Sequence, residues 1–356
     1  MTTVHPLARA HYAKLPTAEV VLEHPNHFEG PQTFLNLNIN KFEADQIRFY
    51  PDVLNKELHR QYLAMLPKLS NGATIETLNE KNLLFTTGSL GGIEAVLKAF
   101  CEPGIDRVIV TNPTFAYYGY WAQIENLEVI DIPLVGQDLN RLDVARILEQ
   151  DAKVIFLCNP NNPVGTAIHP DDVKQVLDNF KGIVVMDEAY IEWTDMQTYA
   201  QHLHTYENLM ITRTFSKAWA LAGARVGAVL ASEVMIRTLQ FPTTRFNLSL
   251  PVYKLLQEAI SKPELILEYK RLNQINRQRL AEFLKQCPFI DYVYPSVSSY
   301  LLFRSKQASA ISEYLGQQGL RILDLTRGMA DHARISIGTE AQTDMLIECI
   351  TRFQNQ

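Results

Sequence analysis

The sequence predicts an α/β protein, with a large domain built on a mostly parallel central sheet flanked by helices and a smaller α+β domain at the C-terminal end. Through the middle of the chain, short apolar runs alternate with helical patterns, as expected for β-α units with buried parallel strands. After about residue 250 the pattern changes to long helices followed by short strands. The length of 356 residues suits two such domains.

Each apolar run of the large domain fits one strand. The expected strands are residues 83–87, 107–111, 127–132, 153–158, 183–187, 209–213 and 225–231. Helical spacing falls between them, at residues 92–100, 116–125, 142–148 and 173–180. These helices supply the crossover connections that parallel strands require.

The second half of the pattern predicts the smaller domain. Helices are expected at 252–259, 264–285, 308–317 and 341–353, and strands at 292–294, 300–303, 321–323 and 333–337. We therefore place the large domain at 35–250 and the small domain at 251–356. Residues 1–34 show no clear period and are interpreted as an N-terminal arm.

Composition excludes several classes of protein. Hydrophobic residues make up 47% and charged residues 20% of the chain, which is typical of a globular protein. A net charge of -6 argues against a general nucleic-acid binder. The four cysteines are far apart in the sequence and form no CxxC pair, so neither a zinc site nor a disulfide framework is indicated. Without a secretory signal or a long apolar run, a cytoplasmic protein that neither spans a membrane nor binds a metal is expected.

Polar side chains follow two of the expected strands, at the edge of the sheet where ligands bind in open parallel sheets. The strand at 183–187 ends in Asp187, Glu188 follows, and Tyr190 lies three residues beyond Asp187. A buried carboxylate there needs a cationic or hydrogen-bonding partner, although an isolated Asp also suits a helix N-cap. Asn162 lies in the Asn- and Pro-rich turn after the strand at 153–158 and is expected at the same edge.

Lys217 lies in the most informative segment, residues 212–227, among Ala, Trp, Leu and Gly residues. A lysine in apolar surroundings loses solvation, so the pKa of its amine falls and the amine can form a Schiff base. Thr214, Ser216 and Arg225 flank it and could together hold a phosphate. A surface lysine beside a structural arginine is the alternative for any one of these residues alone.

A glycine-rich turn at residues 87–94 connects an expected strand to an expected helix. Gly88, Ser89 and Leu90 lie in it, and such a turn can direct backbone N–H groups and a helix dipole at an anion. Its spacing matches neither a Walker A loop nor a dinucleotide fingerprint.

In their order along the chain, these motifs resemble the fold type I pyridoxal-phosphate aminotransferases, and most of all the histidinol-phosphate aminotransferase branch. The resemblance runs from about residue 35 to the C-terminus and includes residues 49–52, 213–218 and 334–339. It implies a pyridoxal 5'-phosphate cofactor and a homodimer, in which Tyr50 reaches the phosphate of the neighbouring subunit.

The resemblance also implies a role for each candidate residue. Lys217 would form the Schiff base and then shuttle a proton, while Asp187 would pair with the pyridinium nitrogen. Arg334 would clamp the substrate α-carboxylate. The remaining cofactor ligands are Asn162 and Tyr190 for the phenolic oxygen, Phe115 for the ring face, and Gly88, Ser89, Leu90, Thr214, Ser216 and Arg225 for the phosphate.

Departures from the branch bear on the substrate. Leu323 lies where relatives place an Arg for a substrate phosphate, and Arg321 or Arg327 could substitute. Arg321 is expected on the same strand face as Leu323 and is therefore a candidate substrate ligand. Asn38 is a second candidate substrate ligand, although its segment lacks the acidic residue usual in the branch.

The implied activity is a ping-pong transfer of an amino group. The donor pair would be glutamate and 2-oxoglutarate, and histidinol phosphate or a related amino compound would be the second substrate. Two alternatives stay open: a decarboxylase resembling threonine-phosphate decarboxylase, and a non-catalytic regulator built on the same fold.

Overall fold

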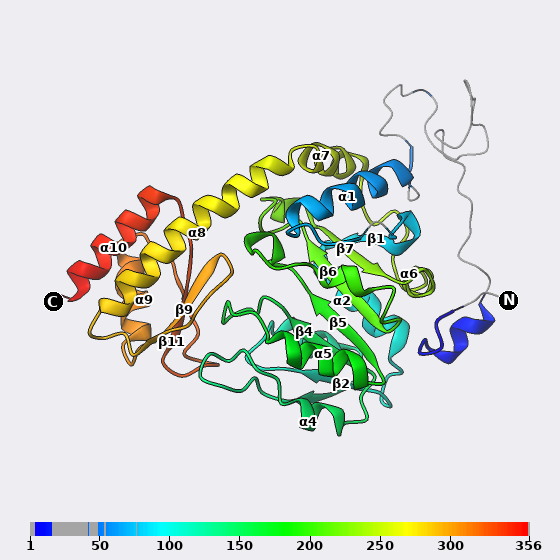
Figure 1. Ribbon diagram of the computed structural model, residues 1–356, viewed down its shortest axis with the longest axis horizontal. Coiled ribbons are helices and arrows are strands. Elements are labelled where there is room, and N and C mark those ends of the chain that lie inside the picture. The colour runs from blue at the N-terminus through cyan, green and yellow to red at the C-terminus, as the bar shows by residue number, and fades with distance from the viewer. Residues whose placement is uncertain (1–3, 16–41, 43–48, 53–54, 76, 355–356) are drawn as a thin grey trace.

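A computed structural model describes residues 4–15, 42, 49–52, 55–75 and 77–354 of the chain, and it contains two β-sheets (Figure 1). The candidate residue Asn38 lies outside the described residues. No helix within these ranges has the length and apolar content needed to cross a membrane.

The larger sheet has seven strands in the order β1-β7-β6-β5-β4-β2-β3. Strands β2 to β6 pair in parallel, whereas β7 runs antiparallel to both β1 and β6. This confirms the expected α/β fold with a mostly parallel sheet. The strands are β1 Leu83–Thr87, β2 Arg107–Val110, β3 Glu128–Asp131, β4 Val154–Cys158, β5 Ile183–Asp187, β6 Leu209–Thr214 and β7 Val226–Ala231.

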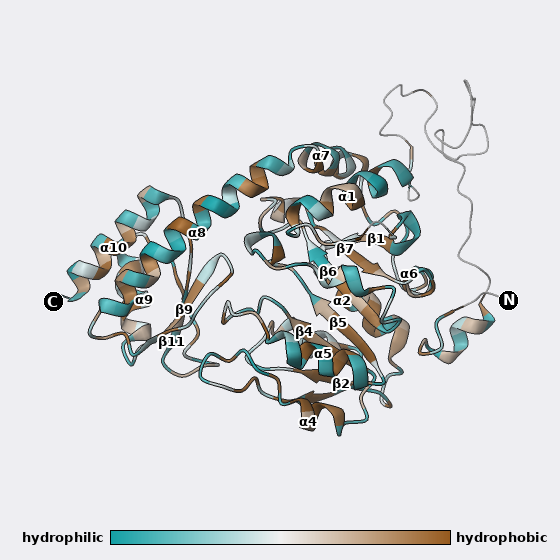
Figure 2. Cartoon of the chain, in the orientation of Figure 1, coloured by the Kyte–Doolittle hydropathy of each residue, from teal (hydrophilic) through white to brown (hydrophobic). Residues whose placement is uncertain are grey.

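Helices cover both faces of this sheet, because alternate residues of its buried strands point to opposite faces. In β4, Ile155 and Leu157 pack with one set of helices, and Phe156 packs with the other. Figure 2 shows most strands of this sheet as hydrophobic and the helices as mixed, as a buried sheet requires. The first set is α1 Lys56–Leu69, α4 Val144–Leu148, α5 Pro170–Asn179 and α7 Leu250–Ile260; the second is α2 Gly88–Phe100, α3 Tyr117–Ile124 and α6 Glu233–Leu239.

The smaller sheet is antiparallel throughout, in the order β10-β11-β9-β8. Its helices share one core with it, to which α8, α9 and α10 contribute Leu284, Ile311 and Ile350. Helix α8 is long and runs from α7 to this core (Figure 1). The elements are β8 Tyr292–Val293, β9 Tyr300–Arg304, β10 Leu323–Asp324, β11 His332–Ser336, α8 Pro263–Gln286, α9 Ala308–Gln317 and α10 Glu340–Gln354.

Several expected elements begin at other residues in the structure, and two of these differences involve candidate residues. The helix expected at 92–100 begins at Gly88, so the glycine-rich turn is itself the first turn of α2. The strand expected at 321–323 begins only at Leu323, because the chain is still in the connection after Gly319, whose φ is +81°. Arg321 therefore shares no strand with Leu323, and the expectation that the two lie on one strand face is wrong.

Helices α1 and α6 were not expected. In α1 the buried residues Leu58, Tyr62 and Leu66 recur every four positions, which is a helical period that the sequence does carry. The proposed boundary at residues 250 and 251 coincides with the start of α7, whose Leu256 and Ile260 pack in the core of the larger sheet. That boundary stays a prediction.

Candidate active site

The carboxyl ends of β4, β5 and β6 bring the candidate residues of three segments to one edge of the larger sheet. Cys158 pairs with Asp187 in the strand register, and Asp187 pairs with Thr212. The Asn-rich turn continues from β4, and the segment with Lys217 continues from β6. The edge predicted from the sequence is therefore the edge where these side chains gather.

Asp187 is almost fully buried, with 2% of its surface exposed. The Tyr118 hydroxyl donates to its Oδ2 at 2.5 Å, and the Ala189 N–H donates to its Oδ1 at 3.1 Å. Burial raises the pKa of Asp187, and the Tyr118 hydrogen bond opposes that shift. Asp187 is not a helix N-cap, because the next helical turn begins at Ile191 with Tyr190 as its cap.

Lys217 lies in the loop between β6 and β7, with its Nζ 5.4 Å from the centroid of the Tyr190 ring. Although the residue is exposed by surface area, the protein around its amine displaces enough water to lower the pKa of Lys217. The positive charge of Arg334 lowers it further, and the charge of Asp187 opposes the shift. A lysine with a lowered pKa can act as a nucleophile, and that role for Lys217 stays a prediction.

The start of α2 and the loop before β7 form a site suited to an anion. Gly88 has a φ of +67°, and a Cβ at this position would lie 2.6 Å from Nη2 of Arg225. Arg225 Nη1 lies 3.4 Å from the Ser216 hydroxyl oxygen and donates to it, while the Ser216 N–H donates to the Thr214 hydroxyl at 3.2 Å. Free backbone N–H groups of a helix N-terminus next to a guanidinium favour a phosphate, and Ser89 and Leu90 lie in that first turn.

Arg334, in β11, extends from the smaller sheet to the same edge. Its Nη1 donates a hydrogen bond to Oδ1 of Asn162, and its Cζ lies 4.8 Å from the centroid of the Tyr300 ring. The Tyr300 hydroxyl donates to the carbonyl oxygen of Asn161 at 2.6 Å. The Nε of Arg334 is buried and has no hydrogen-bond partner within the described part of the chain. A carboxylate of a substrate would satisfy that donor.

Two pairs of aromatic rings adjoin Asp187 and Arg334 through Tyr118 and Tyr300. Phe115 contacts Tyr118 edge to face at 5.5 Å between centroids, and the Tyr190 ring contacts Tyr300 in the same way at 5.1 Å. Tyr50 is 53% exposed, and its ring lies 4.8 Å from that of Phe246.

The residues named for the second substrate are less closely grouped. Leu323 lies opposite Arg334 in the strand register and is 43% exposed. Facing residues of antiparallel strands point to the same side of a sheet, so Leu323 lies beside Arg334. Arg321 lies beside α9, where a Cβ on Gly316 would be 3.8 Å from its Nη1, and Arg327 is exposed in the loop after β10.

Sequence reasoning missed Tyr118 and Tyr300, which contact the candidate residues directly. The sequence does carry one signal for Tyr118, because its position three residues after Phe115 is one helical turn away. Sequence reasoning also missed the buried Arg213, whose Nη1 donates to Glu192 Oε1 at 3.0 Å and whose Nε lies 2.9 Å from Glu188 Oε2. No motif in the sequence marks that ion triad.

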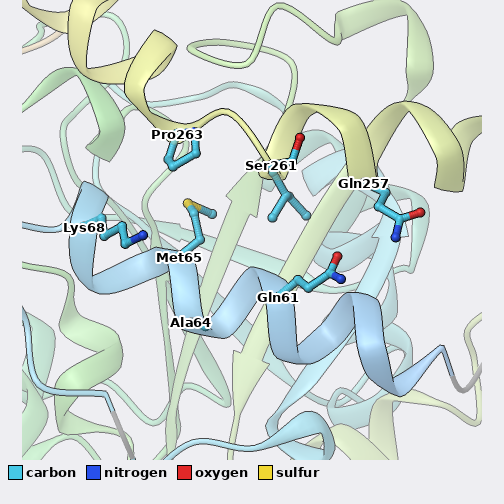
Figure 3. Close-up of a pocket in the computed structure, with 8 residues that line it drawn as sticks. Gln61, Ala64, Met65, Lys68, Gln257, Ser261 and Pro263 are labelled. Atoms are coloured by element: carbon cyan, nitrogen blue, oxygen red, sulfur yellow. The ribbon is translucent and has the colours of Figure 1, made fainter.

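A separate cavity of about 410 Å³ lies between α1 and α7 (Figure 3). Gln61 and Lys68 of α1 line one side, and Gln257 of α7 and Ser261 line the other. None of the candidate catalytic residues contributes to it.

At the edge of this α/β sheet, the structure brings together a lysine, a buried carboxylate and an anion site. This combination is typical of enzymes whose phosphate-bearing cofactor is bound to a lysine. A match to the family model "Aminotransferase class I and II" covers residues 24–350, and the chain belongs to this family. The pyridoxal 5'-phosphate dependence expected from the resemblance is that of the family.

Relatives support the same assignment. The chain is 36% identical over 285 residues to the histidinol-phosphate aminotransferase of Xanthomonas euvesicatoria pv. vesicatoria (strain 85-10), with coverage of 77% of this chain and 78% of that protein. It is 34% identical over 319 residues to the enzyme of the same name from Shigella sonnei (strain Ss046), with coverage of 86% and 89%.

Solved structures share the fold. The histidinol-phosphate aminotransferase of Sinorhizobium meliloti, in complex with pyridoxal-5'-phosphate, gives a TM-score of 0.76 at 20% identity, with coverage of 86% of this chain and 83% of that one. The L-threonine-O-3-phosphate decarboxylase of Porphyromonas gingivalis gives 0.71 at 22% identity, with coverage of 87% and 92%. At these identities the likeness is one of fold alone.

Proposed function

We propose that this chain catalyses the ping-pong transfer of an amino group between glutamate and a second amino compound, with pyridoxal 5'-phosphate bound to Lys217. The observation that carries the proposal is the setting of Lys217. Burial lowers the pKa of its amine, which lies 5.4 Å from the centroid of the Tyr190 ring and within electrostatic reach of Asp187, Arg225 and Arg334. Those three groups match the ring nitrogen, the phosphate and the substrate carboxylate, respectively.

The residues present fit the cofactor. Asp187 is a buried carboxylate with no ion pair to a cationic side chain in the described ranges, and a protonated ring nitrogen would supply that charge. The Oδ1 of Asn162 is engaged by Arg334, which leaves its Nδ2 to donate, together with the Tyr190 hydroxyl, to the phenolic oxygen. Phe115 would cover the ring face. The phosphate would be bound by the N–H groups of Gly88, Ser89 and Leu90 and by Thr214, Ser216 and Arg225.

When bound, pyridoxal phosphate supplies an electrophilic carbonyl carbon and a ring that withdraws electrons from the substrate Cα. Side chains of the protein bind the substrate and transfer its proton. Arg334 binds the substrate α-carboxylate through its Nε and Nη2, which fixes the position of the Cα–H bond. Once the substrate amine has replaced it on the cofactor, Lys217 Nζ would accept the Cα proton and later return it, and its lowered pKa favours the neutral form that this role needs. Asp187 keeps a proton on the ring nitrogen through its negative charge.

Replacement of the lysine tests this proposal. Lys217→Ala should eliminate the visible absorption of the lysine-bound cofactor and reduce transamination by several orders of magnitude. The matched control is Lys174→Ala, because Lys174 is a surface residue paired with Asp178 at 2.5 Å. Full turnover in Lys217→Ala would refute the assignment.

We also propose a homodimer in which Tyr50 completes the neighbouring site, and its exposed ring supports a role outside its own subunit. Hybrid dimers of a Lys217→Ala subunit and a Tyr50→Phe subunit provide the test. If Tyr50 acts across the interface, each hybrid has one site with both native residues, and about half of the activity per dimer returns. If Tyr50 acts within its own subunit, no site has both residues, and mixing restores nothing.

For the second substrate we propose histidinol phosphate or a related amino compound, and for the place of the reaction the cytoplasm. The names of the sequence relatives support the choice of substrate. Loss of cofactor absorption on mixing with single amino compounds would rank the donors. Leu323→Arg would place a guanidinium beside Arg334 and should lower the KM for histidinol phosphate roughly tenfold, the value of one charge-assisted hydrogen bond, without a similar change for glutamate. Release of carbon dioxide without 2-oxoglutarate would select a decarboxylase instead.

A further inference from the structure

Tyr118 makes a direct side-chain hydrogen bond to Asp187. It lies in α3, is fully buried, and stacks on Phe156 of β4 with 4.7 Å between ring centroids and 3° between the ring planes. This packing aims its hydroxyl at Asp187 Oδ2, to which it donates at 2.5 Å. A phenylalanine would fill the same space, so packing alone does not account for the hydroxyl.

The direction of this hydrogen bond follows from where the proton lies. Burial, and next the charge of Asp187, raises the pKa of Tyr118 well above its usual range. The phenol therefore keeps its proton and donates, and the carboxylate accepts. With the Ala189 N–H on Oδ1, each oxygen of Asp187 has at least one donor. Donors on both oxygens fix the carboxylate plane and favour the ionised form over the protonated form.

We propose that Tyr118 is a positioning residue for Asp187: its hydroxyl orients the buried carboxylate and keeps it ionised toward the ring nitrogen of the cofactor. This inference rests on the proposed pairing of Asp187 with that nitrogen. Tyr118 itself touches neither substrate nor cofactor in this account, and it acts only through Asp187. Loss of the Tyr118 hydroxyl should therefore weaken the binding that depends on the ring nitrogen more than the binding of the rest of the cofactor.

The experiment compares two cofactors on the full-length chain freed of cofactor. One is pyridoxal phosphate, and the other is its deaza analogue, in which a C–H group replaces the ring nitrogen. Fluorescence titration gives both dissociation constants for the unmodified protein, for Tyr118→Phe and for the control Tyr117→Phe. Tyr117 lies on the same helix but is 44% exposed.

The unmodified protein should bind pyridoxal phosphate more tightly than the deaza analogue. In Tyr118→Phe this preference should fall by about tenfold to a hundredfold, the range for a hydrogen bond to a charged group, whereas Tyr117→Phe should retain it. Equal weakening of both cofactors in Tyr118→Phe would show a merely structural role and overturn the inference. No preference in the unmodified protein would instead refute the pairing of Asp187 itself, and the inference with it.

Tyr118→Phe keeps the ring that stacks on Phe156, and circular dichroism would check that it folds. If it does not fold, a ring-fluorinated tyrosine at position 118 serves as the second variant. Its hydroxyl is a stronger donor of similar size, so the preference for pyridoxal phosphate should increase. A preference that stays the same or decreases would contradict the proposal.

Discussion

Arg334 Nη1 donates a hydrogen bond to Oδ1 of Asn162, which joins β11 of the smaller sheet to the turn after β4 of the larger one. The contact fixes one side of the guanidinium and leaves the buried Nε without a partner within the described residues. An arginine oriented in this way is prepared to bind a carboxylate at little further cost in side-chain entropy.

Asn162→Ala should therefore weaken substrate binding. The substitution removes a hydrogen bond to a charged group, which contributes about 1.5–3 kcal/mol, so kcat/KM for glutamate should fall roughly tenfold to a hundredfold. The control is Asn179→Ala, because the Asn179 side chain bonds only to the Gln175 carbonyl in the described structure and lies on an exposed helix end. Steady-state kinetics of both variants would test this, and equal kinetics would contradict it.

The lowered pKa of Lys217 predicts a pH profile for the chain freed of cofactor. Below that pKa the amine is charged and unreactive, and above it the amine is neutral, so an amine-reactive reagent should modify Lys217 at lower pH than it modifies surface lysines. Because the charge of Arg334 lowers this pKa, Arg334→Met should move the midpoint of reactivity to higher pH. Because Asp187 raises it, Asp187→Asn should move the midpoint to lower pH.

Mass spectrometry of the modified peptide gives the midpoint for each variant. Two shifts in opposite directions would be difficult to explain by general loosening of the fold. A shift in the same direction in both variants would show that changes in burial, rather than these two charges, control the amine.

Gly227 in β7 permits the close approach of α2 that forms the anion site. A Cβ at this position would lie 2.3 Å from the carbonyl carbon of Gly88 and 2.5 Å from the amide nitrogen of Ser89. Gly227→Ala should therefore displace the first turn of α2, reduce stability by about 1–3 kcal/mol as overpacking does, and weaken binding of the cofactor phosphate.

Gly223→Ala is the matched control, because a Cβ there would meet no atom within 4 Å and the residue lies in the same segment as Arg225. Thermal unfolding and cofactor titration would compare the two variants. If both lose cofactor affinity to the same degree, close packing of β7 on α2 is not what shapes the site.

The sequence was sufficient for the parts of the structure that depend on local pattern. The strand at Ile183–Asp187 and the helix at Ala308–Gln317 have the bounds that apolar periodicity predicted. Asp187 and Lys217 could be named because a charged residue after an apolar strand, or within apolar surroundings, is visible in one dimension. Contacts across the fold were not accessible in this way.

Tyr118 and Asp187 are 69 positions apart, and only the sheet order brings α3 against β5. Arg321 shows the opposite error, since alternation along a strand was assumed where the chain does not yet form one. Register and strand bounds depend on tertiary pairing, which one sequence does not reveal.

Arg213 takes part in a buried ion triad that also depends on tertiary pairing. Its side chain in β6 is 1% exposed and lies between Glu188 and Glu192, which are equally buried. Arg213→Met would leave two buried carboxylates without a cation, and removal of one partner of a buried ion pair costs about 3–5 kcal/mol. Arg279→Met is the control, because Arg279 pairs with Asp344 at the surface at 2.5 Å, and such pairs contribute less than about 1 kcal/mol.

The loss of stability in Arg213→Met should also depend on pH. Burial raises the pKa of Glu192, and the charge of Arg213 opposes that shift, so the variant raises this pKa further. The native state of the variant then binds more protons than the unfolded state once the pH exceeds the ordinary Glu pKa of about 4.3, so its stability should be lower at about pH 8 than at about pH 5. Urea unfolding at both pH values would measure it. If the destabilisation of Arg213→Met is the same at both pH values, or no larger than that of Arg279→Met, Arg213 does not compensate buried charge on Glu188 and Glu192.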